Sequence, residues 1–241
     1  MKRASARVLV VGVGGLGCPA ALALVDGGVG RLTLVDDDLV SLDNLHRQIL
    51  YTTRDAGRAK VDAAAELLCA RASDVAITTL ETRLTSVNIL DMVRAHDLVL
   101  DGTDSPATKF LLNDACVRAG VPLVHAGAVR WAGQLLVVAP GGPCLRCFFE
   151  GPPPAADGES CREVGVAGPL VGWVGALAAA RALSFLDGEI DLGELWTVDG
   201  LRGQLRKVPF RKRPGCRGCD TRAPFEPLES IVTASADERR A

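Results

Sequence analysis

A glycine-rich loop, Gly12-Val13-Gly14-Gly15-Leu16-Gly17, follows directly on the apolar run Arg7 to Val11 and leads into a helix-like segment. A strand, a glycine loop and a helix in this order let backbone N–H groups and a helix N-terminus approach a phosphate closely. Asp36 ends the next strand-like run, where a carboxylate can accept hydrogen bonds from ribose hydroxyls. The start of the chain therefore predicts a nucleotide-binding α/β fold.

Polar residues shortly after Asp36 narrow the choice of nucleotide. Alone, the loop and the aspartate are most typical of a dinucleotide-binding dehydrogenase. Asn44, Arg47 and Gln48, however, lie within five residues of one another. A nicotinamide site does not require these groups, whereas a triphosphate calls for a guanidinium fork and amide donors. The block favours ATP over a nicotinamide cofactor.

Apolar runs alternate with helix-like segments such as Ala59 to Ala70 and Thr108 to Ala119, which predicts right-handed βαβ units. The runs are Val8 to Val11, Leu32 to Val35, Val75 to Leu80, Leu98 to Leu100 and Leu123 to Val124; later ones are Gln134 to Val138, Glu194 to Val198 and Gly203 to Val208. We expect a Rossmann-like, mostly parallel sheet that the later runs extend as antiparallel strands. The 241 residues, 48% of them hydrophobic, suit one domain over 1–225, with a mobile loop at about 151–163 and a flexible tail over 226–241.

Charge and hydropathy bear on the partners and the compartment. A net charge of −2 gives no electrostatic case for nucleic acid. The first apolar run is already the nucleotide strand, so we read no secretory leader and expect a cytoplasmic protein. The longest apolar stretch, 164–180, is interrupted by glycines and a proline and is shorter than the roughly 20 residues of a membrane span. We interpret it as a buried or interfacial helix.

Eight cysteines in a reducing compartment point to metal or thiol chemistry rather than disulfides. Two C-x2-C pairs, Cys144/Cys147 and Cys216/Cys219, could supply four thiolates to a closed tetrahedral Zn²⁺ site with a structural role. Four free thiols are the alternative. A redox pair is less favoured because neither pair is expected to open a helix after a strand. The remaining cysteines, apart from Cys161, are expected in the core: Cys18, Cys69 and Cys116.

Lys60 and Asp104 are further candidates for the nucleotide site. Lys60 opens a helix-like segment, and Asp104 lies just after the strand-like run Asp97 to Leu100, at the end of a strand where such sheets hold ligands. A lysine there can take phosphate charge, and an aspartate can hold Mg²⁺. Singly, each is better explained as a surface lysine or a helix N-cap aspartate. Together with the glycine loop, the two residues favour a nucleotide-binding site.

The spaced motifs resemble the ThiF/MoeB/HesA family, the bacterial relatives of ubiquitin-activating enzymes. The matching elements, in family order, are Gly12-x-Gly14-Gly15-x-Gly17, Asp36-x-Asp38-x-Val40-x-x-x-Asn44-Leu45-x-Arg47-Gln48, Lys60-Val61, Asp101-x-Thr103-Asp104, the two cysteine pairs, and Cys161-x-x-x-Gly165-Val166-x-Gly168-Pro169-x-Val171-Gly172. The resemblance implies ATP-dependent adenylation of the C-terminal Gly-Gly carboxylate of a ubiquitin-like sulfur-carrier protein, with release of pyrophosphate.

The resemblance also implies roles for particular residues. The nucleotide would be bound by Gly14, Gly15, Gly17, Asp36 at the ribose, Asp38, and Asn44, Arg47, Gln48 and Lys60 at the phosphates, with Asp104 holding magnesium. Arg47, Lys60, Asp104 and Cys161 are the candidate catalytic residues. No general base is needed, because a carboxylate is ionised at neutral pH. We therefore interpret the three histidines, His46, His96 and His125, as structural or surface groups.

Cys161 follows a proline-rich loop and has Arg162 beside it, a setting that can lower a thiol pKa. In the family, the matching cysteine can form a disulfide or acyl-disulfide link with the sulfur carrier. The alternative is that Cys161 is an exposed thiol without a function. Sulfur would come from a separate sulfurtransferase or desulfurase, since no rhodanese-like domain follows Cys219. The small face of the helix after Pro169 suits close packing, and in the family this region contributes to a homodimer.

Two departures from the family pattern keep other functions open. Relatives usually begin with a helix whose arginine reaches the ATP of the neighbouring subunit, whereas here the nucleotide strand starts almost at once and only Lys2, Arg3 and Arg7 are available. Ser105 stands where an asparagine is common. The alternatives are adenylation of a peptide C-terminus or a tRNA-linked carboxylate, a non-catalytic partner subunit of an activating enzyme, and a nicotinamide dehydrogenase.

Overall fold

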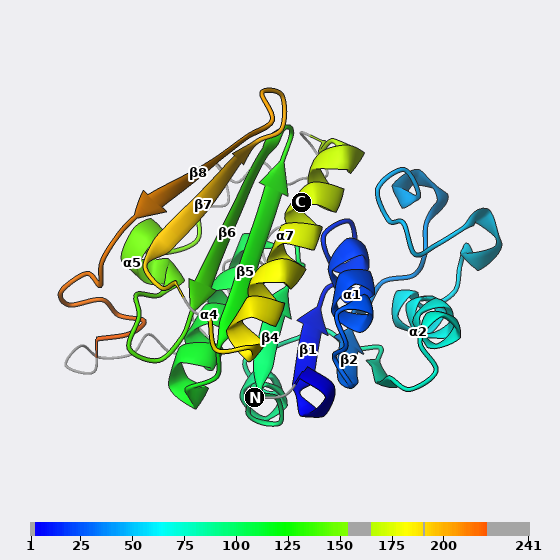
Figure 1. The fold of residues 1–241 in the computed structure, drawn as a ribbon, viewed down its shortest axis with the longest axis horizontal. Coiled ribbons are helices and arrows are strands. Elements are labelled where there is room, and N and C mark those ends of the chain that lie inside the picture. Colours follow the sequence, from blue (N-terminus) through cyan, green and yellow to red (C-terminus); the bar gives the residue numbers. More distant parts are fainter. Residues whose placement is uncertain (1–2, 154–164, 190, 221–241) are drawn as a thin grey trace, which may run out of the picture.

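One eight-stranded sheet forms the centre of the computed structural model, which describes residues 3–153, 165–189 and 191–220 (Figure 1). Its strand order is β3-β2-β1-β4-β5-β6-β7-β8. The strands are β1 (Arg7–Val11), β2 (Arg31–Val35), β3 (Ala76–Leu80), β4 (Leu98–Asp101), β5 (Leu123–Val129), β6 (Ala132–Val138), β7 (Glu194–Asp199) and β8 (Gln204–Pro209). The α-helices are α1 (Gly17–Asp26), α2 (Lys60–Arg71), α3 (Ile89–Arg94), α4 (Pro106–Ala119), α5 (Leu145–Phe149) and α7 (Gly168–Leu186), and short 3₁₀ turns are η1 (Arg3–Ser5), η2 (Leu42–Asn44) and η3 (Thr53–Asp55).

The sheet is parallel at one end and antiparallel at the other. Strands β3, β2, β1, β4 and β5 pair in parallel, and β6, β7 and β8 are added antiparallel. The expected mostly parallel α/β sheet with an antiparallel extension is confirmed. β5 continues five residues beyond the predicted run, because its second half pairs with β6 from His125 to Val129.

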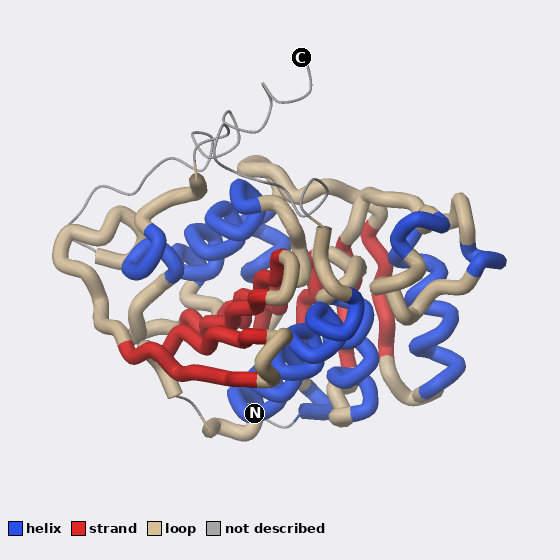
Figure 2. Tube along the Cα trace, turned by 90° about the horizontal axis from the view of Figure 1, so that it is seen from above, coloured by secondary structure: helices blue, strands red, loops and turns tan. Residues whose placement is uncertain are grey.

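Helices cover both faces of the sheet, as Figure 2 shows from above. One apolar core lies between the sheet and α1, α2 and α7, and a second lies between the sheet and α3, α4 and α5. Successive side chains of β1 point to opposite faces of the sheet and so contribute to both cores. Val8 and Val10 lie in the first core, whereas Leu9 and Val11 lie in the second. This two-sided burial explains why the central parallel strands β1 and β4 consist almost entirely of apolar residues.

Helix α7 contains most of the apolar stretch that the sequence analysis interpreted as a buried or interfacial helix. Its length and composition would allow a membrane span, but core helices of folded proteins meet the same criteria. α7 packs on α1, β5 and β6, with Leu170, Val174 and Ala178 buried. A methyl group on Gly175 would lie 2.4 Å from the carbonyl oxygen of Leu16, so α7 also touches the end of the glycine loop.

Two local expectations need correction or refinement, and two others lie wholly or mostly outside the described residues. Cys18 and Cys116 are buried as predicted, but Cys69 is exposed, because it lies on the outward face of α2. Helix α4 begins at Pro106, two residues before the predicted start, since the Ser105 side chain accepts a hydrogen bond from the Thr108 N–H at 3.3 Å and caps it. The predicted tail over 226–241 and most of the predicted mobile loop lie outside the described residues.

Candidate functional site

The glycine loop joins β1 to α1 through very close backbone packing. Gly12 has a φ of +83°, and a methyl group on it would lie 2.9 Å from the carbonyl carbon of Gly102. A methyl group on Gly17 would lie only 1.9 Å from the Gly12 carbonyl oxygen. Leu16, the N-cap of α1, makes no side-chain cap hydrogen bond. The loop therefore presents an uncapped helix N-terminus, which suits an anion.

Arg47 and Gln48 lie over the loop. The backbone oxygen of Asn44 accepts from the N–H groups of Arg47 and Gln48, both at 3.1 Å, so these residues follow a tight turn. A methyl group on Gly15 would be 3.5 Å from Arg47 Cδ, and one on Gly14 would be 3.6 Å from Gln48 Nε2. The chain thus brings a guanidinium-bearing side chain and a carboxamide to the edge of the phosphate-type loop.

Gln48 carries an unsatisfied polar atom. Its side chain is buried, and Oε1 has no hydrogen-bond partner within the described part of the chain. A buried amide without a partner is costly, so such an atom commonly faces a ligand or water. The open Gly14 backbone beside this amide leaves room for a phosphate to approach. Both observations fit a nucleotide.

Lys60 is buried at the start of α2, which excludes the surface-lysine alternative. Its Nζ lies 2.7 Å from Asp38 Oδ2 and 3.8 Å from Asp36 Oδ1. Asp36 Oδ2 accepts from the Val13 N–H of the glycine loop at 2.7 Å. Burial raises the pKa of Asp36 above its ordinary value, and Lys60 and the Asp38 and Val13 N–H groups oppose that rise. The ammonium is thereby held between two carboxylates beside the loop.

Asp104 is exposed at the junction of β4 and α4. It does not cap α4, because Ser105 does, and this excludes the N-cap alternative for Asp104. Gly102 lies two residues before Asp104. A methyl group added to Gly102 would lie 2.7 Å from the Gly12 carbonyl oxygen, so the β4–α4 junction packs on the glycine loop. An exposed carboxylate next to a phosphate-type loop has the oxygen chemistry that Mg²⁺ prefers.

A buried polar cluster behind this junction escaped the sequence analysis. Asp101 Oδ2 lies 2.8 Å from His125 Nδ1 and 3.1 Å from Lys109 Nζ, and Lys109 also donates to the Ala126 carbonyl oxygen at 2.5 Å. Burial alone would raise the pKa of Asp101, but Lys109 and His125 lower it to about 2. No local signal pairs these residues, because only the register Asp101↔His125 of β4 and β5 brings them together.

Burial of His125 in this cluster favours its neutral form. Burial lowers its pKa below the ordinary value, and the hydrogen bond with Asp101 only partly opposes that effect. A carboxylate can only accept, so we assign the ring proton to Nδ1, which donates to Asp101. Nε2 then faces the Gln134 amide nitrogen at 3.4 Å. The interpretation of His125 as a structural group agrees with this geometry.

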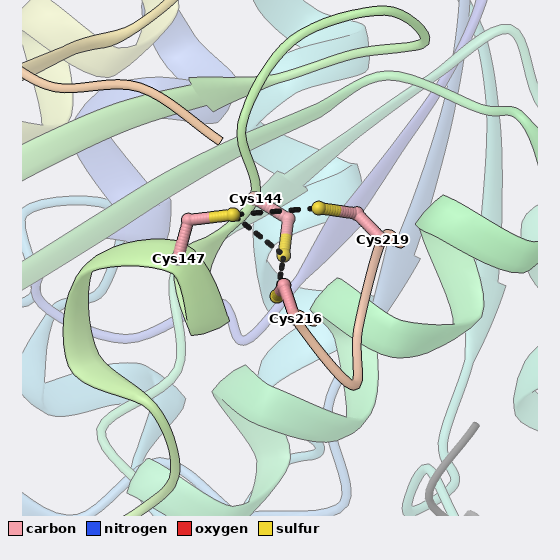
Figure 3. Close-up of side chains that lie close together, drawn as sticks. All are labelled: Cys144, Cys147, Cys216 and Cys219. Atoms are coloured by element: carbon pink, nitrogen blue, oxygen red, sulfur yellow. Dashed lines mark hydrogen bonds between the residues drawn. The ribbon is translucent and has the colours of Figure 1, made fainter. Parts of the chain in front are cut away.

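The two cysteine pairs converge, as Figure 3 shows. The Sγ separations are 3.7 Å for Cys144–Cys216, 3.4 Å for Cys147–Cys219 and 4.0 Å for Cys144–Cys147. Zinc–sulfur bonds of about 2.3 Å in a tetrahedron place sulfurs about 3.8 Å apart, so the cluster fits Zn²⁺. The hydrogen bond from Cys144 lowers the pKa of the Cys147 thiol to about 4 and raises that of Cys144. The cluster favours a shared metal over four independent thiols.

One reason given against a redox role for these cysteines is wrong. Cys144 is the N-cap of α5, so the first pair does open a helix, although β6 ends six residues before Cys144. The convergence of both pairs is a stronger argument for a metal site. Cys161, the remaining candidate catalytic residue, lies outside the described residues.

Comparisons with known proteins identify the family and the fold. The model of the ThiF family matches residues 2–218. The chain is 44% identical over 246 residues to the adenylyltransferase and sulfurtransferase MOCS3 of Bos taurus, covering 99% of this chain and 54% of that protein. It is 43% identical over 221 residues to the sulfur carrier protein ThiS adenylyltransferase of Escherichia coli K12, covering 90% of this chain and 87% of that protein.

The fold is similar to that of a solved structure, E. coli MccB, with a TM-score of 0.80. That match has 22% sequence identity and covers 92% of this chain and 67% of the other. The uba4 adenylyltransferase and sulfurtransferase of Emericella nidulans is 40% identical over 253 residues, which cover 98% of this chain and 52% of that protein. The chain thus spans about half the length of the MOCS3 and uba4 relatives.

Proposed function

The chain belongs to the ThiF family, and from that premise we propose that it adenylates the C-terminal Gly-Gly carboxylate of a ubiquitin-like sulfur-carrier protein. The adenylated carrier is then ready for thiocarboxylate formation with sulfur from a separate donor protein. We further propose a cytoplasmic homodimer. Relatives named as adenylyltransferases at 43% and 44% identity support the reaction type.

In this reaction a carboxylate oxygen of the carrier forms a bond to the α-phosphorus of ATP. The bond from that phosphorus to the bridging oxygen breaks, and pyrophosphate leaves with the electron pair. Arg47 and Lys60 neutralise the phosphates, Asn44 and Gln48 orient them, and Asp36 binds the ribose. Asp104 would hold Mg²⁺, which would supply further charge neutralisation. Alignment and electrostatic stabilisation account for the catalysis, with no nucleophile from the protein.

The placement of Arg47 and Gln48 over Gly14 and Gly15 carries this proposal. A nicotinamide site would leave both side chains without a purpose. A triphosphate uses both, since its oxygens accept from the Arg47 guanidinium and from the amide nitrogen of Gln48. The unsatisfied Gln48 Oε1 is an acceptor and would need a donor such as a ribose hydroxyl. Preferential binding of NAD over ATP would reverse this conclusion.

The direct test is ATP–pyrophosphate exchange with recombinant ThiS, the carrier named for the E. coli relative. ThiS lacking its last two glycines and the variant Asp104→Ala are the matched controls. We expect exchange only with the intact carrier and the unchanged enzyme. If peptides or tRNA-linked carboxylates support exchange and no Gly-Gly protein does, the molecule that is adenylated is one of these and not a ubiquitin-like carrier. Bound ATP without exchange for any acceptor would favour a non-catalytic partner subunit.

The proposal also assigns roles to the cysteines. Zn²⁺ bound by Cys144, Cys147, Cys216 and Cys219 would hold the segment after β8 against α5. Cys161 would act after adenylation: loaded as a persulfide by the sulfur donor, it would attack the acyl adenylate through its outer sulfur, forming an acyl disulfide with the carrier and releasing AMP. A Cys161→Ala variant that exchanges pyrophosphate normally but forms no thiocarboxylate would support that role. Normal thiocarboxylate formation by the same variant would rule it out.

A further inference from the structure

A buried ion pair connects the first cysteine pair to helix α4. Arg146, which lies between Cys144 and Cys147, is buried together with Asp114 of α4. Arg146 Nε lies 2.9 Å from Asp114 Oδ1, and Nη2 lies 2.9 Å from Oδ2. The same guanidinium donates through Nη1 to the Glu150 carbonyl oxygen at 3.0 Å. Arg146 is therefore held in one orientation by a bidentate contact, the strongest geometry for such a pair.

The neighbouring residue on α4 makes a second buried contact. Asn113 Oδ1 accepts from the Leu145 N–H at 2.9 Å, and Asn113 Nδ2 donates to Asp114 Oδ1 at 2.8 Å. Leu145 directly follows Cys144, so Asn113 fixes the backbone of the turn that carries the first ligand pair. Two adjacent side chains of α4 thus hold both the backbone and the side chain between these cysteines.

The second cysteine pair rests on the same arginine. A methyl group on Gly218 would lie 2.9 Å from Arg146 Cδ and 3.0 Å from Cys144 Sγ. The turn between Cys216 and Cys219 therefore packs on the stem of Arg146. The orientation of this side chain decides how closely the two pairs can approach.

We propose that Asn113 and Asp114 are positioning residues that set the ligand geometry of the four-cysteine site before metal arrives. The inference rests on the proposed Zn²⁺ site. Unsupported ligand turns would have to be ordered when the metal binds, at a cost in affinity. Groups that orient metal ligands without touching the metal typically contribute 10- to 100-fold to affinity.

The test measures zinc release from the full-length protein under native conditions, with 4-(2-pyridylazo)resorcinol as the chelator. We expect Asp114→Asn and Asn113→Ala each to release zinc about 10- to 100-fold faster than the unchanged protein. Asp97→Asn is the matched control, because Arg7 binds Asp97 with the same bidentate geometry, at 3.2 and 2.8 Å, away from the cysteines. The unfolding rate of each variant, followed by circular dichroism, separates local release from global unfolding.

Release from both α4 variants at the unchanged rate would overturn the inference while leaving the zinc site intact. Acceleration that only matches the faster unfolding of each variant, or that equals the Asp97→Asn effect, would overturn it as well. If the unchanged protein binds no zinc, the inference and the proposed metal site fail together, whereas the proposed adenylation stands or falls on pyrophosphate exchange alone.

Discussion

The nucleotide end and the cysteine end of the molecule are built in different ways. The glycine loop, Asp36, the Arg47–Gln48 turn and Lys60 all lie within the first 60 residues, in consecutive βα connections. In the cysteine cluster, Cys144 and Cys216 are 72 residues apart, and α4 from a third part of the chain holds the first pair. The first site depends on local backbone geometry, and the second depends on long-range contacts.

Replacing a cluster ligand should produce the largest effect on stability. With Cys216→Ser we expect the metal to be lost and the free energy of unfolding to fall by about 4 kcal/mol or more, because metal binding energy contributes to folding. Urea denaturation and zinc analysis of the purified protein measure both. The matched control is Cys69→Ser on the exposed side of α2, which should stay within about 0.5 kcal/mol. An equal loss of unfolding free energy in Cys216→Ser and Cys69→Ser would show that the cysteine cluster does not stabilise its end of the molecule.

At the nucleotide end, replacing Lys60 should affect activity more than folding. We expect Lys60→Met to slow ATP–pyrophosphate exchange about 100- to 1,000-fold, the typical cost of losing one charge-stabilising group. Arg58→Ala is the control, because Arg58 is exposed and pairs only with Asp55 and Glu66 in the contacts the structure shows. A normal exchange rate in Lys60→Met would remove Lys60 from the phosphate site.

Two glycines of one loop should respond in opposite ways. A methyl group at Gly17 would overlap the Gly12 carbonyl oxygen at 1.9 Å, so we expect Gly17→Ala to lose about 3 kcal/mol of stability. At Gly14 the nearest atom is Gln48 Nε2 at 3.6 Å, so Gly14→Ala should fold normally. Its added methyl group should instead weaken ATP binding about tenfold by blocking close backbone approach. Thermal unfolding measures the loss of stability, and ATP titration measures the loss of binding. If both variants lost stability to the same extent, Gly14 would not be a position whose role is to let ATP approach.

The smallest effect concerns acid stability behind the nucleotide site. The pKa of Asp101 falls from its ordinary 3.8 to about 2 in the folded protein, so its contribution is complete above about pH 4 and is lost as the pH falls towards 2. This shift corresponds to about 2 kcal/mol. The unfolding free energy of the unchanged protein should therefore fall more between pH 5 and pH 2.5 than that of Asp101→Asn. Parallel pH profiles would show that Asp101 is not stabilised by Lys109 and His125.

Much of the fold was predictable because its signals are local. Apolar runs, the glycine loop and the spacing of the cysteine pairs each report on a few consecutive residues, and the mostly parallel sheet with its antiparallel extension followed from them. The misses have a common cause. β5 continues to Val129 because β6 pairs with it, and Cys69 is exposed because only packing decides which face of α2 is covered.

The sequence by itself determined the class of fold, the phosphate-type loop and the residue types for a nucleotide and a tetrahedral metal. Only the tertiary structure decided that Lys60 is buried between two carboxylates, that Asp101 meets His125 and Lys109, and that Asp114 holds Arg146. The physical reason is that buried charges are stable only when opposite charges and hydrogen bonds surround them. The partners of Asp101 and Arg146 come from separate strands and helices, and Lys60 meets Asp36 and Asp38 only through the fold of the β2–α2 connection, so no local pattern records these contacts.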